Sequence, residues 1–354
     1  MTSTTFLKET TKKQAAPTLD STAPVQKQSS QKELAQKELA RDLFSQYSYK
    51  DYQQKLEKLS PENLKQLIDF FSDHFLKEKK RFLLLNSNEE KALGLVSLRD
   101  FSLLSSVLKL NAFLVKDFYA SQQLNLQNRR ETYKKMAKWL QNQYKNAPSF
   151  ASARVAIEDN LAVSALSEAN FYYVTSESLF CKTITKDDFP KNFESMITNI
   201  RPYKPSDLEK IKSIACENHK IGKFHCDTNF SHEEIKTIYV KTLESSLKCD
   251  RHKVFVYALG EEVIGFITII ENKSLSEKLQ RGYGSLDYIC VKKDYQKGGI
   301  GLALNLFGMN YLHKRHCSTL YVKTLSHNYP AINLLNKSNF SLASTSLIYH
   351  YLKR

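Results

Sequence analysis

The chain has 354 residues, enough for two domains of ordinary size or three small ones, because a domain takes roughly 100–200 residues. Hydrophobic, aromatic and charged residues make up 42%, 11% and 25% of the chain, which excludes global disorder and a collagen-like composition. The formal net charge of +15 favours acidic partners, but charge alone does not choose between nucleic acid, anionic lipid and phosphorylated small molecules.

Residues 1–40 predict a disordered tail. They contain one aromatic residue, Phe6, and are dominated by Thr, Ser, Gln, Lys and Ala, so they bury too little apolar surface to offset the entropy of ordering. The doubled QKELA at 31–40 consists of strong helix formers and favours a helix that runs toward Tyr52.

Residues 41–184 predict a first folded domain. Ser60 is placed to cap a helix that begins at Pro61 and carries apolar side chains at helical spacing as far as Phe75. The other elements expected here are a helix over 131–145, a strand over 151–157, a short helix over 159–169 and a β-rich run over 171–182. Residues 185–196, which are polar and interrupted by Pro190, predict a linker.

Residues 197–354 predict a second domain of the α/β or α+β class. A strand at 200–202 and two helices precede a hairpin, whose strands meet at the turn around Gly260. The elements expected after the hairpin are a strand over 285–292, a helix over 299–314, a strand over 318–324, a helix over 328–337 and final strands within 340–351.

Glycine indicates where this chain approaches a ligand. Gly298, Gly299 and Gly301 fall within four residues, between an expected strand and an expected helix. Bare N–H groups at a helix N-terminus, with the positive end of the helix dipole behind them, suit a pyrophosphate, and Lys297 adds a mobile positive charge. Neither the P-loop spacing nor the G-x-G-x-x-G dinucleotide spacing is present.

This stretch resembles the acetyl-CoA loop of the GCN5-related N-acetyltransferase (GNAT) superfamily, written Q/R-x-x-G-x-G/A, because Gln296, Gly299 and Gly301 occupy its three specified positions. The resemblance implies an α+β fold with a mixed, mostly antiparallel sheet flanked by helices, and acetyl-CoA as co-substrate. Its outer parts are Ile200-Arg201-Pro202 with Asp207-Leu208, and Asn328-x-x-Ala331-Ile332-x-Leu334 followed by Asn339-Phe340.

The same resemblance implies where acetyl-CoA binds. The pantetheine arm would enter a V-shaped opening between the fourth and fifth strands of the domain and pair with the backbone of Ile289, Cys290 and Val291. Asn328 would help to hold the cofactor. The loop residues expected around the pyrophosphate are Gln296, Lys297, Gly298, Gly299, Ile300, Gly301 and Leu302.

The implied chemistry is direct attack of an amine on the thioester, which needs a base, a polarised carbonyl and an acid for the leaving thiolate. Asp287 shares strand parity with Val291 and is the candidate base; an ordinary exposed strand carboxylate is the alternative interpretation. Many family members place Tyr seven residues after the closing-motif Asn, where this chain has Leu335. Tyr329 is the alternative acid; otherwise the thiolate leaves unassisted or with water, or catalysis has been lost.

A comparison of the chain with itself at an offset of 169 residues indicates a duplicated architecture. At this offset Gly298, Gly299 and Gly301 fall on bulky side chains, so we expect a degenerate GNAT-like first copy that does not bind acetyl-CoA. The matched pairs are Ala162 with Ala331, Val163 with Ile332, Leu166 with Leu335, Asn170 with Asn339 and Phe171 with Phe340, and the bulky positions are Arg129, Arg130 and Thr132.

A degenerate half in front of a complete acetyltransferase domain is loosely similar to the TDP-fucosamine acetyltransferases, which acetylate a nucleotide-linked amino sugar. Under that resemblance, Phe224 and His225 would contact an anionic substrate. We therefore expect an acetyl-CoA-dependent N-acetyltransferase of small primary amines, with an amino sugar nucleotide as the narrower hypothesis. The alternatives are a protein or peptide N-acetyltransferase and a non-catalytic CoA-binding or interaction protein.

The sequence favours the cytoplasm. It shows no secretory segment, no apolar run near the ~20 residues of a membrane span, and no C-x-x-C pair among its six cysteines. The nearest metal-like group, at 216–226, fits no standard ligand spacing, so no metal is expected. No recognised motif organises the lysines for nucleic acid, so neither nucleic acid nor membrane is an expected partner.

Overall fold

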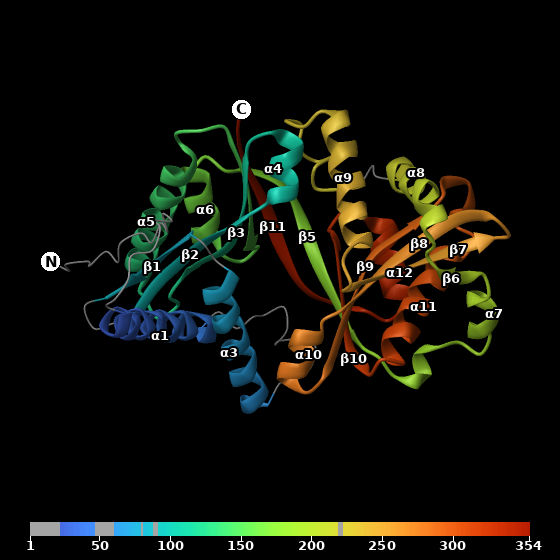
Figure 1. Cartoon of the computed structure of the whole chain (residues 1–354), viewed down its shortest axis with the longest axis horizontal. Coiled ribbons are helices and arrows are strands. Elements are labelled where there is room, and N and C mark those ends of the chain that lie inside the picture. The colour runs from blue at the N-terminus through green and yellow to red at the C-terminus, as the bar shows by residue number, and fades with distance from the viewer. Residues whose placement is uncertain (1–21, 47–59, 79–80, 88–90, 219–221) are drawn as a thin grey trace.

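The computed structural model describes residues 22–46, 60–78, 81–87, 91–218 and 222–354. Within them the chain forms one mixed sheet with helices on both faces (Figure 1). The first half contains α1 (Thr22–Gln46), α3 (Pro61–Glu78), β1 (Arg81–Asn86), β2 (Ala92–Asp100), α4 (Ser102–Leu108), β3 (Asn111–Ala120), α5 (Leu126–Tyr144), β4 (Ser149–Ala156), α6 (Asn160–Glu168) and β5 (Tyr172–Thr183). The second half contains α7 (Phe193–Ile197), β6 (Ile200–Pro202), α8 (Leu208–Asn218), α9 (His232–Leu247), β7 (His252–Leu259), β8 (Glu262–Glu271), α10 (Lys273–Leu279), β9 (Gly282–Val291), α11 (Ile300–His313), β10 (Cys317–Leu325), α12 (Tyr329–Lys337) and β11 (Ser341–Lys353).

The last strand of each half pairs with the other half. The strand order is β1-β2-β3-β4-β11-β5-β10-β9-β8-β7-β6, so β11 of the second half lies between β4 and β5 of the first. β5 in turn pairs along its length with β10 of the second half. The expected linker at 185–196 therefore separates two halves of the sequence but not two sheets, and the expected final strands within 340–351 are the single long β11.

The halves repeat one another in structure. The N-cap of α6 is Asp159, whose side chain accepts from the N–H of Ala162, and the N-cap of α12 is Asn328, whose side chain accepts from the N–H of Ala331. These four residues match at the offset of 169 residues found in the sequence. Contacts between the halves are also reciprocal, since α4 packs against α9 and α10 packs against α3.

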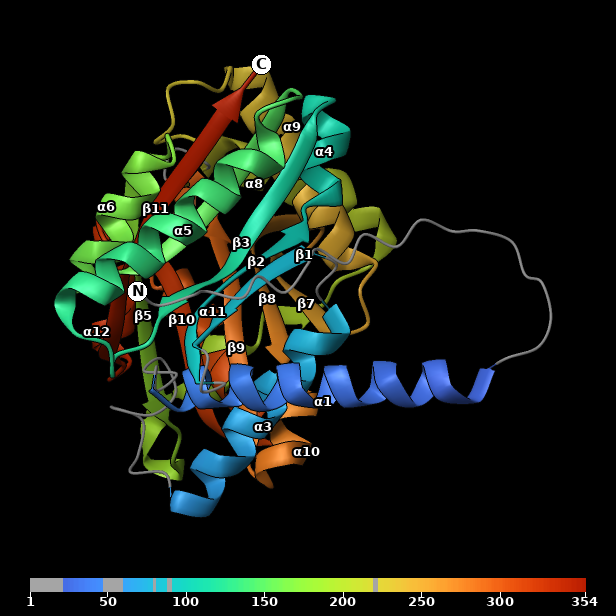
Figure 2. The same cartoon turned by 90° about the vertical axis from the view of Figure 1, so that its left-hand side faces the viewer.

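The helices that follow β3, β4, β9 and β10 lie together on one face of the sheet. In Figure 2, α5, α6, α11 and α12 lie toward one side of the sheet, and α8 and α9 toward the other. Leu304, Met309 and Leu312 of α11 pack with β9 and β10 in one core cluster, whereas Ile211 and Ile214 of α8 pack in another. The two faces of β9 and β10 therefore meet different sets of helices.

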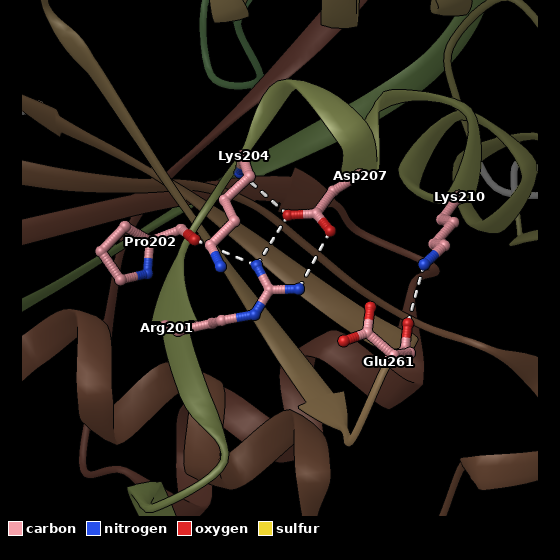
Figure 3. A network of polar contacts seen from close by, with 6 residues as sticks. All are labelled: Arg201, Pro202, Lys204, Asp207, Lys210 and Glu261. Atoms are coloured by element: carbon pink, nitrogen blue, oxygen red, sulfur yellow. Dashed lines mark hydrogen bonds and ion pairs between the residues drawn. The ribbon is translucent and has the colours of Figure 1, made fainter.

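A bidentate ion pair fixes the start of the second half. The guanidinium of Arg201 on β6 donates to Asp207 at 2.7 and 3.0 Å, and the N–H of Lys204 donates to the same carboxylate (Figure 3). Asp207 is buried, and its hydrogen bond from Arg201 lowers its pKa. The carboxylate thus stays ionised and ties the edge strand to the turn that opens α8.

Two sequence expectations differ from the structure. The tail expected through residue 40 contains most of α1. Ala40 lies with Leu43 and Phe44 in a core cluster with Ile68, so the end of this helix buries more apolar surface than the composition of residues 1–40 suggested. Residues 1–21 of that tail lie outside the described residues. The sequence also gave no elements for 81–120, where the structure has three strands and α4.

No helix in the described part of the chain is long and apolar enough to cross a membrane.

The exchange of strands predicts that the halves hold together without a covalent link. A protease site inserted after the exposed Lys191 would be cut between the halves, and we expect them to co-elute on size-exclusion chromatography and unfold as one unit. The reason is that β11 of the second half pairs with two strands of the first, and β5 of the first half pairs with two strands of the second. Elution of separate halves in native buffer would contradict the exchange.

Candidate active site

β9 and β10 stop pairing and diverge about halfway along their length. Their parallel pairing runs from Gly282 with Cys317 to Ser285 with Tyr321, while both strands continue for several residues beyond. The backbone groups of the end of β9 that face β10 therefore have no strand partner there. This is the V-shaped opening expected from the sequence resemblance, and a ligand with amide groups can satisfy that free edge.

A β-bulge at Asp287 lies where the opening begins. The register of β8 against β9 shifts so that Thr268 pairs with Tyr288 and Ile269 with Leu286, which leaves Asp287 as the extra residue. Thr268 lies between residues of the α11 core cluster, so it faces α8 and α9, and its hydroxyl donates to Asp287 at 3.4 Å. The expected parity of Asp287 with Val291 is therefore wrong, because the bulge turns the carboxylate to the opposite face.

The surroundings of Asp287 favour its protonated form. Solvent reaches the side chain, yet the protein around it removes enough water for desolvation to raise the pKa of Asp287. The charge of His252 and the hydrogen bond from Thr268 act in the opposite direction but are weaker. A carboxylate with a raised pKa, at the mouth of a gap between strands, is suited to accept a proton.

The loop between β9 and α11 presents bare backbone. Lys297 and Gly299 have φ values of +68° and +82°, and a Cβ placed on Gly299 would meet nothing within 4 Å. Gly299 is the N-cap of α11 and no side chain caps the helix, so the first N–H groups of the helix point outward. The Gln296 amide donates to the carbonyl of Val291 at 3.0 Å and braces this loop against the end of β9.

Comparison with known proteins identifies this region. Residues 220–340 match the family model described as the acetyltransferase (GNAT) family. These residues form a GNAT acetyltransferase domain. The protein is therefore an acyltransferase, and a search of curated protein sequences gave no match that would name its substrate.

Solved structures of low sequence identity share the fold across both halves. A GCN5-related N-acetyltransferase from Sphaerobacter thermophilus is 12% identical, with 90% of this chain and 92% of that chain covered at a TM-score of 0.56. A tandem GNAT protein from the clavulanic acid biosynthesis pathway is 9% identical, with 90% and 94% covered at 0.50. A glucosamine N-acetyltransferase region of a fungal multi-domain β-N-acetylglucosaminidase is 12% identical, with 89% and 37% covered at 0.56. The duplicated GNAT fold is thus shared with solved proteins.

The closing motif of the GNAT domain supplies no clear acid. Asn328 uses its amide internally, since its oxygen accepts from Ala331 at 3.4 Å and its nitrogen donates to Thr324 at 3.0 Å. Leu335 is 3% exposed and packs in the core. Tyr329 is 68% exposed and makes no hydrogen bond to any described residue.

Sequence reasoning missed a thiol–imidazole pair beside the domain's opening. Sγ of Cys226 lies 3.7 Å from Nε2 of His327, the residue directly before Asn328. The contact joins the loop that precedes α9 to the turn after β10. Proximity of His327 to the capping Asn328 in sequence was the only signal, and Cys226 had been considered solely as a metal ligand.

The loop before α9 carries the two residues expected to contact substrate. Phe224 is 3% exposed and packs with Phe150 and Phe230, so it is a core residue and not a substrate contact. His225 is partly exposed and stacks on Tyr239 with ring centroids 5.4 Å apart. Burial and the charge of His232 lower the pKa of His225, which leaves its imidazole neutral near pH 7.

Asp227 anchors this loop to the exchanged strands. Its buried carboxylate accepts from the hydroxyl of Tyr172 on β5 at 2.9 Å and from Nδ1 of His350 on β11 at 2.7 Å. Burial alone would raise the pKa of Asp227, but these hydrogen bonds and the N–H of Asn229 together lower it. The described residues contain no group of His, Cys, Asp and Glu arranged to hold a metal ion.

A substitution at Gly299 predicts loss of acetyl-CoA binding. In Gly299→Asp, a carboxylate would point into the bare loop and repel the phosphates, and we expect affinity by isothermal titration calorimetry to fall by at least about tenfold. Gly260→Asp is the matched control, because Gly260 also has positive φ (+58°) and open space within 4 Å but lies in a distant hairpin turn. Equal loss of affinity in both variants would contradict this assignment of the loop.

Proposed function

We propose that the protein transfers the acetyl group of acetyl-CoA to a primary amine of a small molecule by direct attack on the thioester. The observation that carries this proposal is that β9 stops pairing with β10 after Ser285 and runs on toward the uncapped N-terminus of α11. The end of β9 offers backbone amide partners to an extended arm, and the start of α11 offers N–H groups to a pyrophosphate. Together they match the two parts of coenzyme A.

The proposed position of acetyl-CoA follows from these elements. The pantetheine arm pairs with the backbone of Ile289, Cys290 and Val291, and the pyrophosphate lies over residues 297–302. Gln296 supports this loop through its bond to Val291 rather than through the cofactor. Asn328 acts by fixing the start of α12 beside the opening.

The acceptor amine approaches from the face of α8 and α9, where the bulge points Asp287. Asp287 takes a proton from the ammonium, directly or through water, as the nitrogen attacks the carbonyl carbon. The thioester C–S bond then breaks and the thiolate takes a proton. His327 is the proposed donor, because it lies in the turn after β10 and its contact with Cys226 holds the ring beside the opening.

The first copy is proposed to bind no acetyl-CoA, for a reason that differs in detail from the sequence argument. Asn125 caps α5 by accepting from the N–H of Asn128, so this helix lacks a free N-terminus. Arg129 lies in the first turn of α5 and contacts Asp159 at 3.3 Å, and Tyr133 donates to the same carboxylate at 2.6 Å. These side chains join α5 to α6 where the second copy leaves its loop bare.

An amino sugar heads the list of acceptors to be tested, because one structural neighbour is described as a glucosamine N-acetyltransferase region. That similarity is at 12% identity and supports the fold rather than the substrate. A non-catalytic CoA-binding protein is the second candidate, and the buried Leu335 with the exposed Tyr329 favours it. Release of free CoA in the presence of an amine panel separates the two.

Titration calorimetry with acetyl-CoA tests both copies at once. We expect one binding site per chain, because α11 starts uncapped at a glycine, whereas the corresponding helix α5 is capped by Asn125. Two sites per chain would show that the first copy is not degenerate, and absence of binding would remove the proposed function.

The raised pKa of Asp287 predicts the pH profile of catalysis. Activity requires the carboxylate, so kcat/KM rises as pH increases through the pKa of Asp287, with a midpoint above the ordinary value of about 4. Asp287→Asn should lower kcat by about 10²–10⁴-fold and abolish this limb of the profile. Glu277→Gln, an exposed carboxylate on α10, serves as the control; an unchanged profile in Asp287→Asn would exclude Asp287 as the base.

A further inference from the structure

Lys223 carries an ammonium group that no acidic side chain neutralises. Within the described residues it forms no ion pair, and its Nζ lies 5.2 Å from the ring centroid of Phe224 and 6.0 Å from that of Phe101. Phe224 belongs to the second half of the chain and Phe101 directly precedes α4 of the first. The ammonium of this half-buried lysine thus lies near aromatic rings of both halves, and its partial desolvation is unfavourable without an anion.

A second cation, Arg154, lies close enough to Lys223 for its charge to act on the ammonium. Arg154 on β4 reaches across β11 to Glu177 on β5, with a contact of 2.8 Å between guanidinium and carboxylate. The side chain of Arg154 is 42% exposed, so one carboxylate does not enclose it. Two cations therefore share a single anion, and the group has one unit of positive charge to spare.

The pKa of Lys223 reflects the same excess of positive charge. Burial and the charge of Arg154 lower the pKa of Lys223 to about 8, and Glu177 only partly opposes them. The groups that face this ammonium are Arg154 from β4, Glu177 from β5 and His350 from β11, whose own pKa is lowered by burial. An anionic ligand would reverse the shift by giving the ammonium a partner.

The position of this group relative to Asp287 follows from the sheet. Leu320 lies in the core cluster under α11, so Tyr321 and alternate residues of β10 face the opposite side, as does Glu177, which pairs with Leu325. Asp287 faces that side too. Two regular strand spacings and about two residues of rise give roughly 12 Å as the smallest separation of the strand positions of Asp287 and Glu177, because β9 and β10 diverge here.

We propose that Lys223 and Arg154 form a binding site for an anionic group of the acceptor, a phosphate or carboxylate carried roughly 10 Å from the amine that is acetylated. This inference rests on the proposed function and names the substrate class of the same site. A neutral small amine leaves the two cations with the single carboxylate of Glu177, whereas an extended anionic amine spans from Asp287 to Lys223. The site is shared by both halves, which gives the first copy a part in substrate recognition.

A homologous series of acceptors tests the reach. We compare ω-aminoalkyl phosphates, ω-amino carboxylates and ω-amino alcohols of two to about ten carbons, the length that covers roughly 12 Å. We expect kcat/KM for the phosphates to exceed that of equally long alcohols by at least about tenfold, with the largest ratio near eight carbons. A carboxylate series that exceeds the phosphates would identify the anion as a carboxylate, and equal values for all three series would overturn the proposal.

Two variants and one control assign the effect to these residues. Lys223→Met should lower the phosphate-to-alcohol ratio by about tenfold, whereas Lys236→Met, which removes the same charge from exposed α9, should leave it unchanged. Glu177→Gln frees Arg154 and should raise the ratio, a gain that misfolding cannot produce. A ratio that Lys223→Met and Glu177→Gln both leave unchanged would overturn the site.

The pH dependence supplies an independent readout. Anion binding needs the charged form of Lys223, so above the second pKa of the phosphate, about 6, the phosphate-to-alcohol ratio falls as pH rises through about 8. The ratio cancels the titration of the amine and of Asp287, which both series share. Calorimetry of acetyl-CoA is run in parallel: if acetyl-CoA binds and amines turn over without anion preference, only this proposal fails, and if neither occurs, the proposed function and the acceptor site fail together.

Discussion

The separation of β9 from β10 is the constraint on which the site depends, and it is maintained from outside the gap. β9 keeps its pairing with β8 as far as Val291, and β10 keeps its pairing with β5 as far as Leu325. Each strand is thus fully bonded on its far side while the near sides diverge. Because β5 belongs to the first half, the opening in the GNAT domain is held by a strand from the other repeat.

The exchange explains what the first copy contributes without a cofactor loop. Its α5 is capped by Asn125 and joined to α6 through Arg129 and Asp159. It also supplies β5 to the second half, receives β11, and sets α4 against α9. None of these contacts between the halves involves the start of α5, so they do not depend on whether that helix binds a cofactor.

Local signals were readable in the sequence, and non-local ones were not. The helix expected over 328–337 and the glycine loop expected before the helix over 299–314 depend on residues close in sequence, and the structure has α12 and the start of α11 there. The exchange of β5 and β11 depends on pairing between distant segments. In β2, residues 94–98 are all buried, so both faces of the strand are covered and the sequence lacks the alternation of apolar and polar residues that marks a strand. The bulge at Asp287 placed its side chain on the opposite face from the one that strict alternation predicts.

The loop that carries Lys223, His225 and Cys226 is anchored to the two exchanged strands. Its anchor, Asp227, is held by Tyr172 on β5 and His350 on β11, the two strands that the halves exchange. His350 is fully buried and its imidazole is kept neutral by burial, so it donates Nδ1–H to a carboxylate whose remaining oxygen accepts from Asn229. The position of the loop before α9 is therefore set by the exchange and not by the GNAT domain alone, because no strand of an isolated second half could supply Tyr172. A GNAT domain excised from this chain would lose β5, which pairs with β10, and the anchor of the loop before α9, which makes the two repeats a single structural unit.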